Sequence, residues 1–488
     1  MVPLINSAPL ALAFLFQRLK WPVPMSRWRT AKEIRNLINT PETRISTTNE
    51  LLNYLDQSRT ESEVCEILTI VFLASPANRP TYEELESRIH CPSLLANMIL
   101  ERTYGPGHGI GEWRVAHSGD APDDFAGGSY FEEHKTAHVP PVFWNNLCRL
   151  ESRSGYPLVQ HWAYEWKTLR DKIGTHFTRY PYYFDNAGDA RAGIISQCWQ
   201  RMREIYLSAY LRTLAYAVSE WHMPQRIAEC YCVDMVHGVA GLFDVEPGAR
   251  PAWLADLPEQ FCNQRANFRC LGIELLNASK TDEMRLVSLN TPIALSVQKF
   301  GNLTLSAHLI TPDYELPDDV YLYEKMSFLF IKDSFELKGP QREILVEEIC
   351  TKGKTGNEVA VCSSLTPMPF GAWQSDYFSM GLNVAAPYIV PESEIQCTSE
   401  SIDSIAPNGK VISTTRIWND NWTPPYPKGG STRCGSVTLI NQDVLDETMG
   451  LLGRKLAFFI RLQIWDREKD YGDYSKSEHT FFMIDVGR

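Results

Sequence analysis

Residues 60–73 read TESEVCEILTIVFL, and their apolar side chains recur at the spacing of an α-helix. Such a stripe is typical of a helix that turns one face toward a core. Thr81–Ile89 follows Pro80 and predicts a second helix. The positions that share the apolar face of the first helix are Val64, Ile67, Leu68, Val71 and Phe72.

Two longer helices are predicted further along the chain. Leu158–His176 carries Trp162, Trp166, Leu169 and Ile173 at intervals of three or four residues, and Ala190–Trp221 carries a longer apolar stripe. Tyr180–Gly188 contains proline, asparagine and glycine and is typical of a turn. We therefore predict an antiparallel helical hairpin.

From about Phe268 the pattern changes to short apolar runs divided by glycine, proline and asparagine, which predicts β-strands. Leu456–Trp465 (LAFFIRLQIW) and Thr480–Val486 are expected to pair across the polar loop Asp466–Glu478. The other predicted strands are Leu303–Ile310, Val320–Tyr323, Phe328–Lys338, Val359–Ser363, Lys410–Arg416 and Ser436–Ile440.

The fold class that follows is a multidomain α+β protein, with a mostly helical N-terminal region before a mixed or antiparallel β-rich C-terminal region. We predict a helical N-terminal region over 1–140, with a Gly-rich loop at 104–128. A helical hairpin region follows over 141–260, and a β-rich α+β domain over 261–488.

Charge and composition narrow the class of protein. The formal net charge of −12 argues against a protein that coats nucleic acid through bulk attraction, although a local basic groove stays open. The 12 cysteines are scattered without a repeated framework, which indicates reduced thiols in a cytoplasmic protein.

The apolar Ala8–Phe16 segment is too short for a membrane span, which needs about 20 residues. We expect it to form a helix docked on the protein body or on a partner.

One segment combines residue types that suit metal-dependent chemistry. Pro317-Asp318-Asp319 precedes a β-like run that ends in Glu336-Leu337-Lys338, and Pro340 favours a helix over 340–350 before the next strand. This order resembles the core of PD-(D/E)xK nucleases over residues 317–363. The resemblance implies that Asp318 (or Asp319) and Glu336 bind Mg²⁺ or Mn²⁺, while Lys338 stabilises developing phosphate charge.

The same segment supports a plainer interpretation. Alternation places Glu336 and Lys338 on a mostly polar face of the strand, and apolar residues such as Phe335 and Leu337 on the other. A half-exposed antiparallel strand has this pattern. In that case both charged side chains are simply solvated.

A second candidate lies at the end of the first hairpin helix. Arg170 and His176, separated by five residues, resemble the R-x₄₋₆-H signature of HEPN ribonucleases, in which such a pair acts on the 2′-hydroxyl and the scissile phosphate. The two side chains converge only if the helix ends near Gly174. Otherwise they are cations that favour the C-terminal end of the helix dipole.

The stretch RLKWPVPMSRWRTAKEIR, residues 18–35, combines basic residues with two tryptophans. Trp21, Arg27, Trp28 and Arg29 form a candidate site for a protein partner, since tryptophan and arginine are enriched at interfaces. Stacking on nucleic-acid bases and a purely structural connector are the alternatives.

Two functional hypotheses follow. The first is a non-catalytic binding or assembly subunit of an intracellular multiprotein complex, with another protein subunit as the partner. Microbial antiviral defence against phage or mobile elements is a setting suggested by association. The alternative is a metal-dependent nuclease, with Mg²⁺ or Mn²⁺ as cofactor; otherwise no cofactor is indicated.

Overall fold

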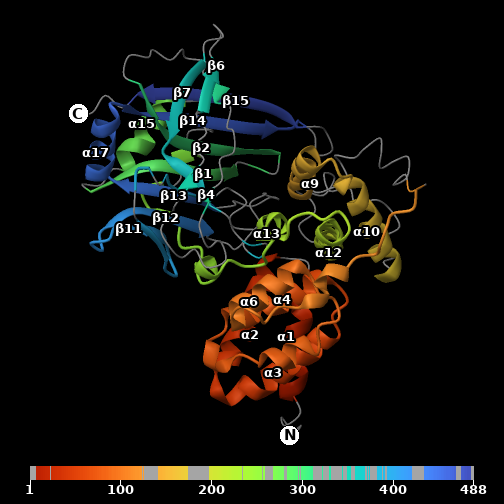
Figure 1. Ribbon diagram of the computed structural model, residues 1–488. Helices are drawn as coiled ribbons and strands as arrows, with labels where there is room; N and C mark the ends of the chain where they lie inside the picture. The colour runs from red at the N-terminus through yellow and green to blue at the C-terminus, as the bar shows by residue number, and fades with distance from the viewer. Residues whose placement is uncertain are drawn as a thin grey trace. The chain divides into compact units, whose positions relative to one another are not determined.

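A computed structural model describes the chain in segments that fall into two compact units (Figure 1). The helical unit comprises Met1–Gly238 and Gly371–Gln374, and the sheet unit comprises Val239–Phe370 and Ser375–Arg488. This layout confirms the predicted α+β class, with a mostly helical N-terminal region before a β-rich C-terminal region. The described residues are 7–21, 24–123, 125, 141–173, 197–233, 235–254, 257–258, 268–279, 283–294, 296, 298–311, 321–322, 329–330, 343–344, 349–352, 358–368, 371, 373, 382–386, 388–390, 393–419, 434–468 and 474–484.

The helical unit is built from short and medium α-helices with intervening 3₁₀ turns. Proline opens α2, α3 and α9, where its missing N–H costs nothing because the first N–H groups of a helix have no partner within it. In chain order the elements are α1 (Ser7–Gln17), η2 (Arg18–Lys20), α2 (Pro24–Asn39), α3 (Pro41–Asp56), α4 (Glu61–Leu73), η3 (Pro76–Asn78), α5 (Tyr82–Glu86), α6 (Leu94–Tyr104), η4 (Gly111–Val115), α9 (Pro141–Ser154), α10 (Leu158–Ile173), α12 (Gln197–Ser219) and α13 (Gln225–Val233).

Helix α4 confirms the prediction for residues 60–73. The Thr60 side chain caps its N-terminus by accepting from the Glu63 backbone N–H. Every residue from Glu61 to Phe72 is buried, so the polar face of the helix is enclosed as fully as the apolar face. Helix α5 carries a capping box between Thr81 and Glu84 but ends at Glu86, short of the predicted Ile89.

Helices α10 and α12 are the two long helices expected from the sequence. The His161 ring stacks on Tyr216, and Trp162 Nε1 donates to the Tyr206 carbonyl. Further along α10, the Trp166 ring stacks on Tyr206, which lies earlier on α12 than Tyr216. The two helices are therefore antiparallel. The predicted turn at 180–188 lies outside the described residues.

The sheet unit contains an 11-stranded antiparallel sheet among the described residues. Its main path runs β10-β11-β12-β13-β1-β2-β7-β6-β3, while β14 pairs with both β2 and β15. The strands are β1 (Met284–Ala294), β2 (Lys299–Ile310), β3 (Tyr321–Leu322), β4 (Leu329–Phe330), β5 (Glu343–Ile344), β6 (Ile349–Lys352), β7 (Glu358–Ser363), β8 (Leu365–Pro367), β9 (Asn383–Ala385), β10 (Glu394–Cys397), β11 (Ile402–Ile405), β12 (Val411–Asn419), β13 (Cys434–Asn441), β14 (Lys455–Asp466) and β15 (Ser475–Ile484).

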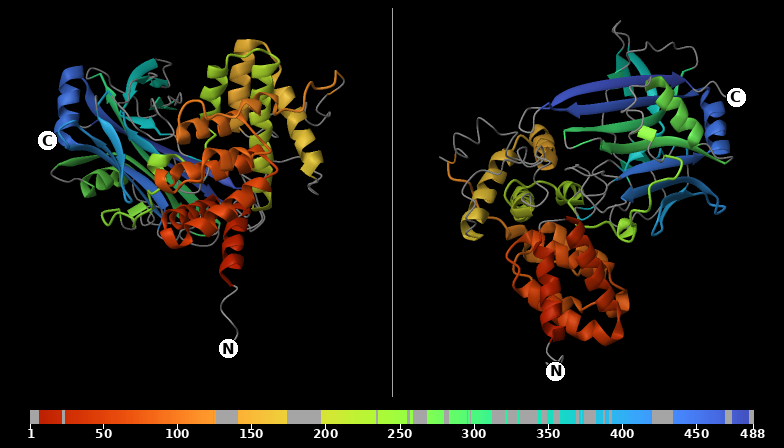
Figure 2. Two further views of the ribbon diagram at one scale, coloured as in Figure 1. Left: turned by 60° about the horizontal axis from the view of Figure 1, so that its bottom comes forward. Right: turned by 180° about the vertical axis from the view of Figure 1, so that it is seen from behind.

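One face of this sheet forms the core of the unit. Leu303 of β2 lies opposite Leu462 of β14, and Leu305 lies opposite Ile460, so these side chains share a face. Helix α15 (Phe268–Ala278) lies over the sheet, and helix α17 (Gln442–Leu452) lies at the ends of the strands (Figure 2). They contribute Leu271, Leu275 and Leu445 to the same buried cluster.

The predicted pairing of the last two strands is confirmed, with one correction. Strand β15 begins at Ser475, so the polar loop is shorter than predicted. Glu478 lies on the strand opposite Gln463, and its Oε1 is 2.6 Å from Arg461 Nε. Strand β15 therefore begins among residues that were predicted to form the polar loop. Their charged side chains fit a strand because they pair with charged side chains of β14.

The helix predicted over 340–350 is wrong. Glu343–Ile344 is β5, paired with β4, and Ile349–Lys352 is β6, paired with β7. A Gly-Pro start is a weak local signal, and pairing with a neighbouring strand overrides it. The order of elements expected for a PD-(D/E)xK core is not reproduced in these described residues.

Candidate functional site

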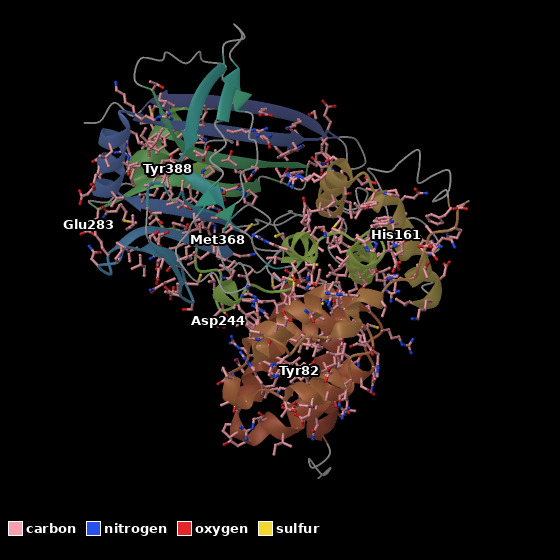
Figure 3. All side chains as sticks on the ribbon, in the orientation of Figure 1. Tyr82, His161, Asp244, Glu283, Met368 and Tyr388 are labelled. Carbon is pink, nitrogen blue, oxygen red and sulfur yellow. The ribbon has the colours of Figure 1, made fainter. Side chains whose placement is uncertain are left out.

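The helical unit encloses charged side chains that ordinarily face water. Glu61 and Glu66 are each only 1% exposed, Glu165 is 0%, and Arg27 is 6%. A buried charge without a partner is strongly destabilising, so each must be paired. Two buried clusters result, one around Arg27 and the other around Arg212. Figure 3 shows the side chains of the unit and labels His161, which belongs to the second cluster.

The Arg27 cluster ties three helices together. Arg27 on α2 donates to both carboxylate oxygens of Glu66 on α4, at 2.9 and 2.7 Å. Its Nη1 also lies 3.3 Å from Glu204 Oε1 on α12. Trp373 Nε1 donates to Glu66 Oε1 at 2.8 Å. Two parallel N–H···O bonds fix the guanidinium in orientation as well as in charge.

The protonation of this cluster is fixed. Burial alone would lower the pKa of Arg27, but the charges of Glu66 and Glu204 raise it above its ordinary value. Burial, followed by the charge of Glu66, raises the pKa of Tyr54 well above its usual range. The Arg27 guanidinium and the Tyr54 phenol therefore keep their protons at neutral pH, so this cluster acts as a structural clamp.

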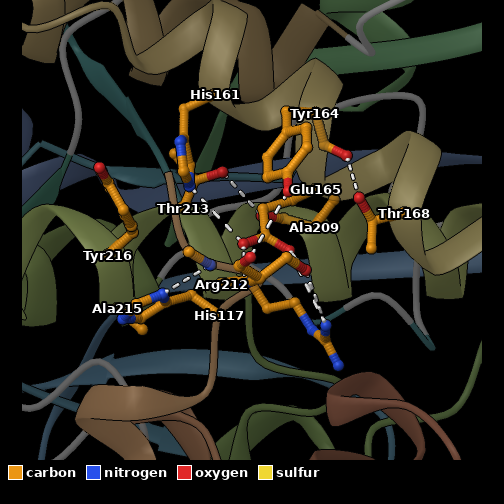
Figure 4. Close-up of polar contacts among 12 residues, drawn as sticks. His117, His161, Tyr164, Glu165, Thr168, Ala209, Arg212, Thr213, Ala215 and Tyr216 are labelled. Atoms are coloured by element: carbon orange, nitrogen blue, oxygen red, sulfur yellow. Dashed lines mark hydrogen bonds and ion pairs between the residues drawn. The ribbon is translucent and has the colours of Figure 1, made fainter. Parts of the chain in front are cut away.

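The Arg212 cluster joins α12, α4 and α10 to the loop after η4 (Figure 4). Arg212 Nε donates to Glu61 Oε1 at 2.6 Å, and its Nη1 lies 3.8 Å from Glu165 Oε2. Glu165 accepts from the backbone N–H and the hydroxyl of Ser118, at 2.5 and 2.7 Å. A single guanidinium thus lies between two buried carboxylates, one of which holds the loop.

Two histidines border the Arg212 cluster. His161 is 3% exposed, and its ring stacks on Tyr216 at a centroid distance of 3.8 Å. Its Nε2 lies 3.6 Å from Glu165 Oε1, beyond hydrogen-bond length, and makes no hydrogen bond to any described residue. His117 lies in the loop, with Nε2 3.0 Å from Ser219 Oγ. The Tyr216 hydroxyl donates to Asp120 of the same loop.

The two carboxylates beside Arg212 differ in acidity. Burial raises the pKa of Glu61 above its ordinary value. Burial also acts to raise the pKa of Glu165, but His161, the Ser118 donors and the charge of Arg212 together lower it below its ordinary value. Such divergence occurs in sites that move protons. Here Glu61 and Glu165 are almost completely enclosed, so the arrangement stabilises the loop rather than presenting a reactive group to a substrate.

The residues expected to carry nuclease chemistry are only partly described. Asp318, Asp319, Glu336 and Lys338 lie outside the described residues, as does His176. Arg170 lies on α10, where its Nη2 donates to Asp171 Oδ1 at 3.2 Å and its guanidinium lies 4.9 Å from the Trp166 ring centroid. Across the described parts of the chain, no cluster of three or more His, Cys, Asp or Glu side chains is arranged to hold a metal ion.

The four residues proposed for partner binding divide into two pairs. Arg27 and Trp28 are buried within the helical unit, so their side chains support its core. Trp21 is 45% exposed, and Arg29 is also exposed. Of the four residues, Trp21 and Arg29 are therefore the ones that a partner can reach.

The clusters around Arg27 and Arg212 were not predicted, although the sequence contains a signal for them. Glu61 and Glu66 interrupt an otherwise apolar helix, and Glu165 lies between Trp162 and Trp166. A carboxylate inside an apolar stripe indicates a buried partner. What the chain does must be inferred from its own residues, because no protein-family model and no curated protein matches it.

Proposed function

We propose that the protein is a non-catalytic assembly subunit that binds another protein through the outer side of α1 and η2. Helix α1 reads SAPLALAFLFQ, and apolar residues occupy its whole circumference. A helix that is apolar all round is normally enclosed on all sides. The observation that carries the proposal is that only one side of α1 is enclosed by the described residues.

The inner side of α1 and η2 belongs to the core of the helical unit. Leu15, Phe16 and Leu19 are 7%, 0% and 0% exposed. The Phe16 ring lies 5.8 Å from that of Tyr54 on α3. This packing holds the helix on the unit and determines which residues face outward.

The outer side presents Leu10, Phe14 and Trp21, which we call the α1 surface. They are 76%, 60% and 45% exposed. Leu10 and Phe14 are four residues apart and so share a helix face, and the Phe14 and Trp21 rings meet edge to face at 6.4 Å. Contiguous exposed apolar side chains with an aromatic anchor are typical of protein-binding sites.

A basic residue borders the α1 surface. The Arg18 guanidinium lies 5.4 Å from the centroid of the Trp21 ring. Interfaces commonly have an apolar centre and a polar rim of complementary charge. The partner we expect therefore offers an apolar patch or groove with acidic side chains at its edge. Among the helices that the structure describes, none is long and apolar enough to cross a membrane.

The experiment that tests this proposal replaces exposed side chains and leaves the core intact. Deleting residues 1–35 would remove buried Arg27 and Trp28, so it would test folding as much as binding. The double variant Leu10→Glu/Phe14→Glu instead adds charge to the α1 surface alone. Ile45→Glu on α3 is the matched control, since Ile45 is 71% exposed and lies outside the surface.

Each tagged full-length protein would be purified from its native cells, and the co-purifying proteins would be measured by quantitative mass spectrometry. We expect a stoichiometric partner with wild type and with Ile45→Glu, and its loss with the double variant. Circular dichroism would verify that all three proteins are folded. Equal recovery of the partner with the double variant would contradict the proposed surface.

A further inference from the structure

Residues 116–120 form a turn that is fastened to α10 and α12 at several points. Ser118 donates twice to Glu165, and Asp120 accepts from the Tyr216 hydroxyl. His117 contacts Ser219. Gly119 has φ of +81°, a conformation that side-chain-bearing residues rarely adopt. These contacts hold the turn in one defined conformation.

The hydrogen bonds of His117 fix its tautomer. The Gly119 backbone N–H donates to His117 Nδ1 at 3.1 Å, so Nδ1 carries a lone pair and no proton. The ring proton therefore lies on Nε2, 3.0 Å from Ser219 Oγ. Ser219 Oγ can accept it because the serine hydroxyl donates to the Ala215 carbonyl at 3.1 Å. The observed geometry requires a neutral imidazole.

We infer that His117 is an acid-sensitive catch, which holds the turn of residues 116–120 while its imidazole is neutral and releases it when the imidazole is protonated. Protonation adds a hydrogen at Nδ1 and uses the lone pair that accepts from Gly119. Two N–H groups then face each other across 3.1 Å, and the Gly119 amide loses its acceptor. A partly buried amide without an acceptor is unfavourable, which favours opening of the turn.

The charged groups around His117 come from every element that packs against it. Helix α10 contributes Glu165 and His161, helix α12 contributes Arg212 and Tyr216, Glu220 follows the end of α12, and the turn contributes Asp120. Glu220 Oε1 is 3.7 Å from Nε2. Glu165 and Glu220 favour the protonated ring, whereas burial, His161 and Arg212 oppose it.

Burial is the largest of these influences, and the pKa of His117 lies below its ordinary value of 6.5. A histidine with a lowered pKa in the folded state stabilises the fold fully above its unfolded pKa. This stabilisation is lost as the pH falls below 6.5 toward the folded pKa. Glu165 keeps its charge through the first part of this range because its own pKa is below 4.5.

Hydrogen–deuterium exchange of the full-length protein tests the catch. Protection of the Gly119 amide would be measured between pH 7.5 and 4.5, with each value divided by the exchange rate of the unfolded chain at the same pH. We expect protection to fall several-fold on acidification while the core of α4 keeps its protection. Protection of Gly119 that stays constant over this range would overturn the inference.

A matched pair of variants assigns the effect to one ring. In His117→Asn the side-chain carbonyl can accept from the Gly119 N–H, as in an Asx turn, but cannot be protonated in this range. We expect its Gly119 protection to be independent of pH, whereas His90→Asn, at an exposed histidine, keeps the wild-type fall. A wild-type fall in His117→Asn would assign the effect to another group and overturn the inference.

A second measurement covers the case in which His117→Asn does not fold. The ring of His117 in the wild-type protein would be titrated by nuclear magnetic resonance. We expect it to titrate below pH 6.5, with the same midpoint as the loss of Gly119 protection. Midpoints that differ by a full pH unit would overturn the inference.

Discussion

Arg27 on α2 holds both carboxylate oxygens of Glu66 on α4, with Nε 2.9 Å from Oε1 and Nη2 2.7 Å from Oε2. Removing one partner of such a pair leaves an uncompensated buried charge. We expect Arg27→Met to lower the free energy of unfolding by about 3–5 kcal/mol. Urea unfolding of the full chain, followed by far-ultraviolet circular dichroism, measures this loss.

Arg29→Met is the matched control for Arg27→Met, because Arg29 lies on the same helix but is exposed. An exposed substitution should change the free energy by no more than about 0.5 kcal/mol. Equal losses for the two variants would show that the buried clamp does not stabilise the helical unit.

The sheet unit has its own pH-sensitive group in His308 on β2. Burial lowers the pKa of His308 to about 4, and its ring packs against Phe459. Because the folded pKa is depressed, the stabilisation is complete above pH 6.5 and is lost as the pH falls toward 4. This lowering of the pKa corresponds to a change of about 3 kcal/mol in the free energy of unfolding.

His308→Leu should therefore make the unfolding free energy of the sheet unit less dependent on pH between 6.5 and 4. Thermal unfolding at several pH values measures the dependence. His479→Leu, at an exposed histidine of β15, is the control and should behave as wild type. An unchanged pH dependence in His308→Leu would contradict the prediction.

Gly435 on β13 lies where no side chain fits. An added Cβ would lie 2.4 Å from the Trp418 ring and 2.5 Å from the Asn290 carbonyl oxygen. We expect Gly435→Ala to destabilise the protein by about 1–3 kcal/mol, the usual cost of overpacking. In contrast, Gly450→Ala on α17 meets nothing within 4 Å and should stabilise by about 0.5–1 kcal/mol. A neutral Gly435→Ala in thermal unfolding would show that the strand can shift.

The nuclease alternative stays a prediction, since Glu336 and Lys338 lie outside the described residues. If the segment holds a metal-dependent site, the protein should cut end-labelled DNA or RNA with Mg²⁺ or Mn²⁺ but not with EDTA. Lys338→Ala should then abolish cutting, whereas loss only in His176→Ala would indicate the helical pair instead. Absence of cutting under all conditions would leave the assembly function as the better hypothesis.

Local patterns predicted the elements that carry strong periodicity. The Thr60 cap and the stripe of residues 60–73 specify α4, and alternation specifies β14, because each signal lies within one short segment. The helix over 340–350 failed because strand pairing overrode a weak local preference. Local sequence signals therefore predicted a helix or strand wherever one short segment contained several of them.

The buried clusters could not be predicted in the same way. Arg212 pairs with Glu61, 151 positions away, and Arg27 pairs with Glu66, 39 positions away. Single-segment patterns carry no information about such partners. The same holds for Trp28 and Arg27, which belong to a basic, tryptophan-bearing stretch but face the core, because only the packing of α2 on α4 determines their direction.

We propose that the α1 surface contacts a partner protein directly. Site-specific photo-crosslinking tests it most directly, with p-benzoylphenylalanine replacing Phe14 in one protein and Ile45 in another, both exposed. We expect a covalent adduct with the stoichiometric partner at position 14 and none at position 45. A partner that co-purifies but forms no adduct from position 14, or an equal yield from both positions, would contradict it.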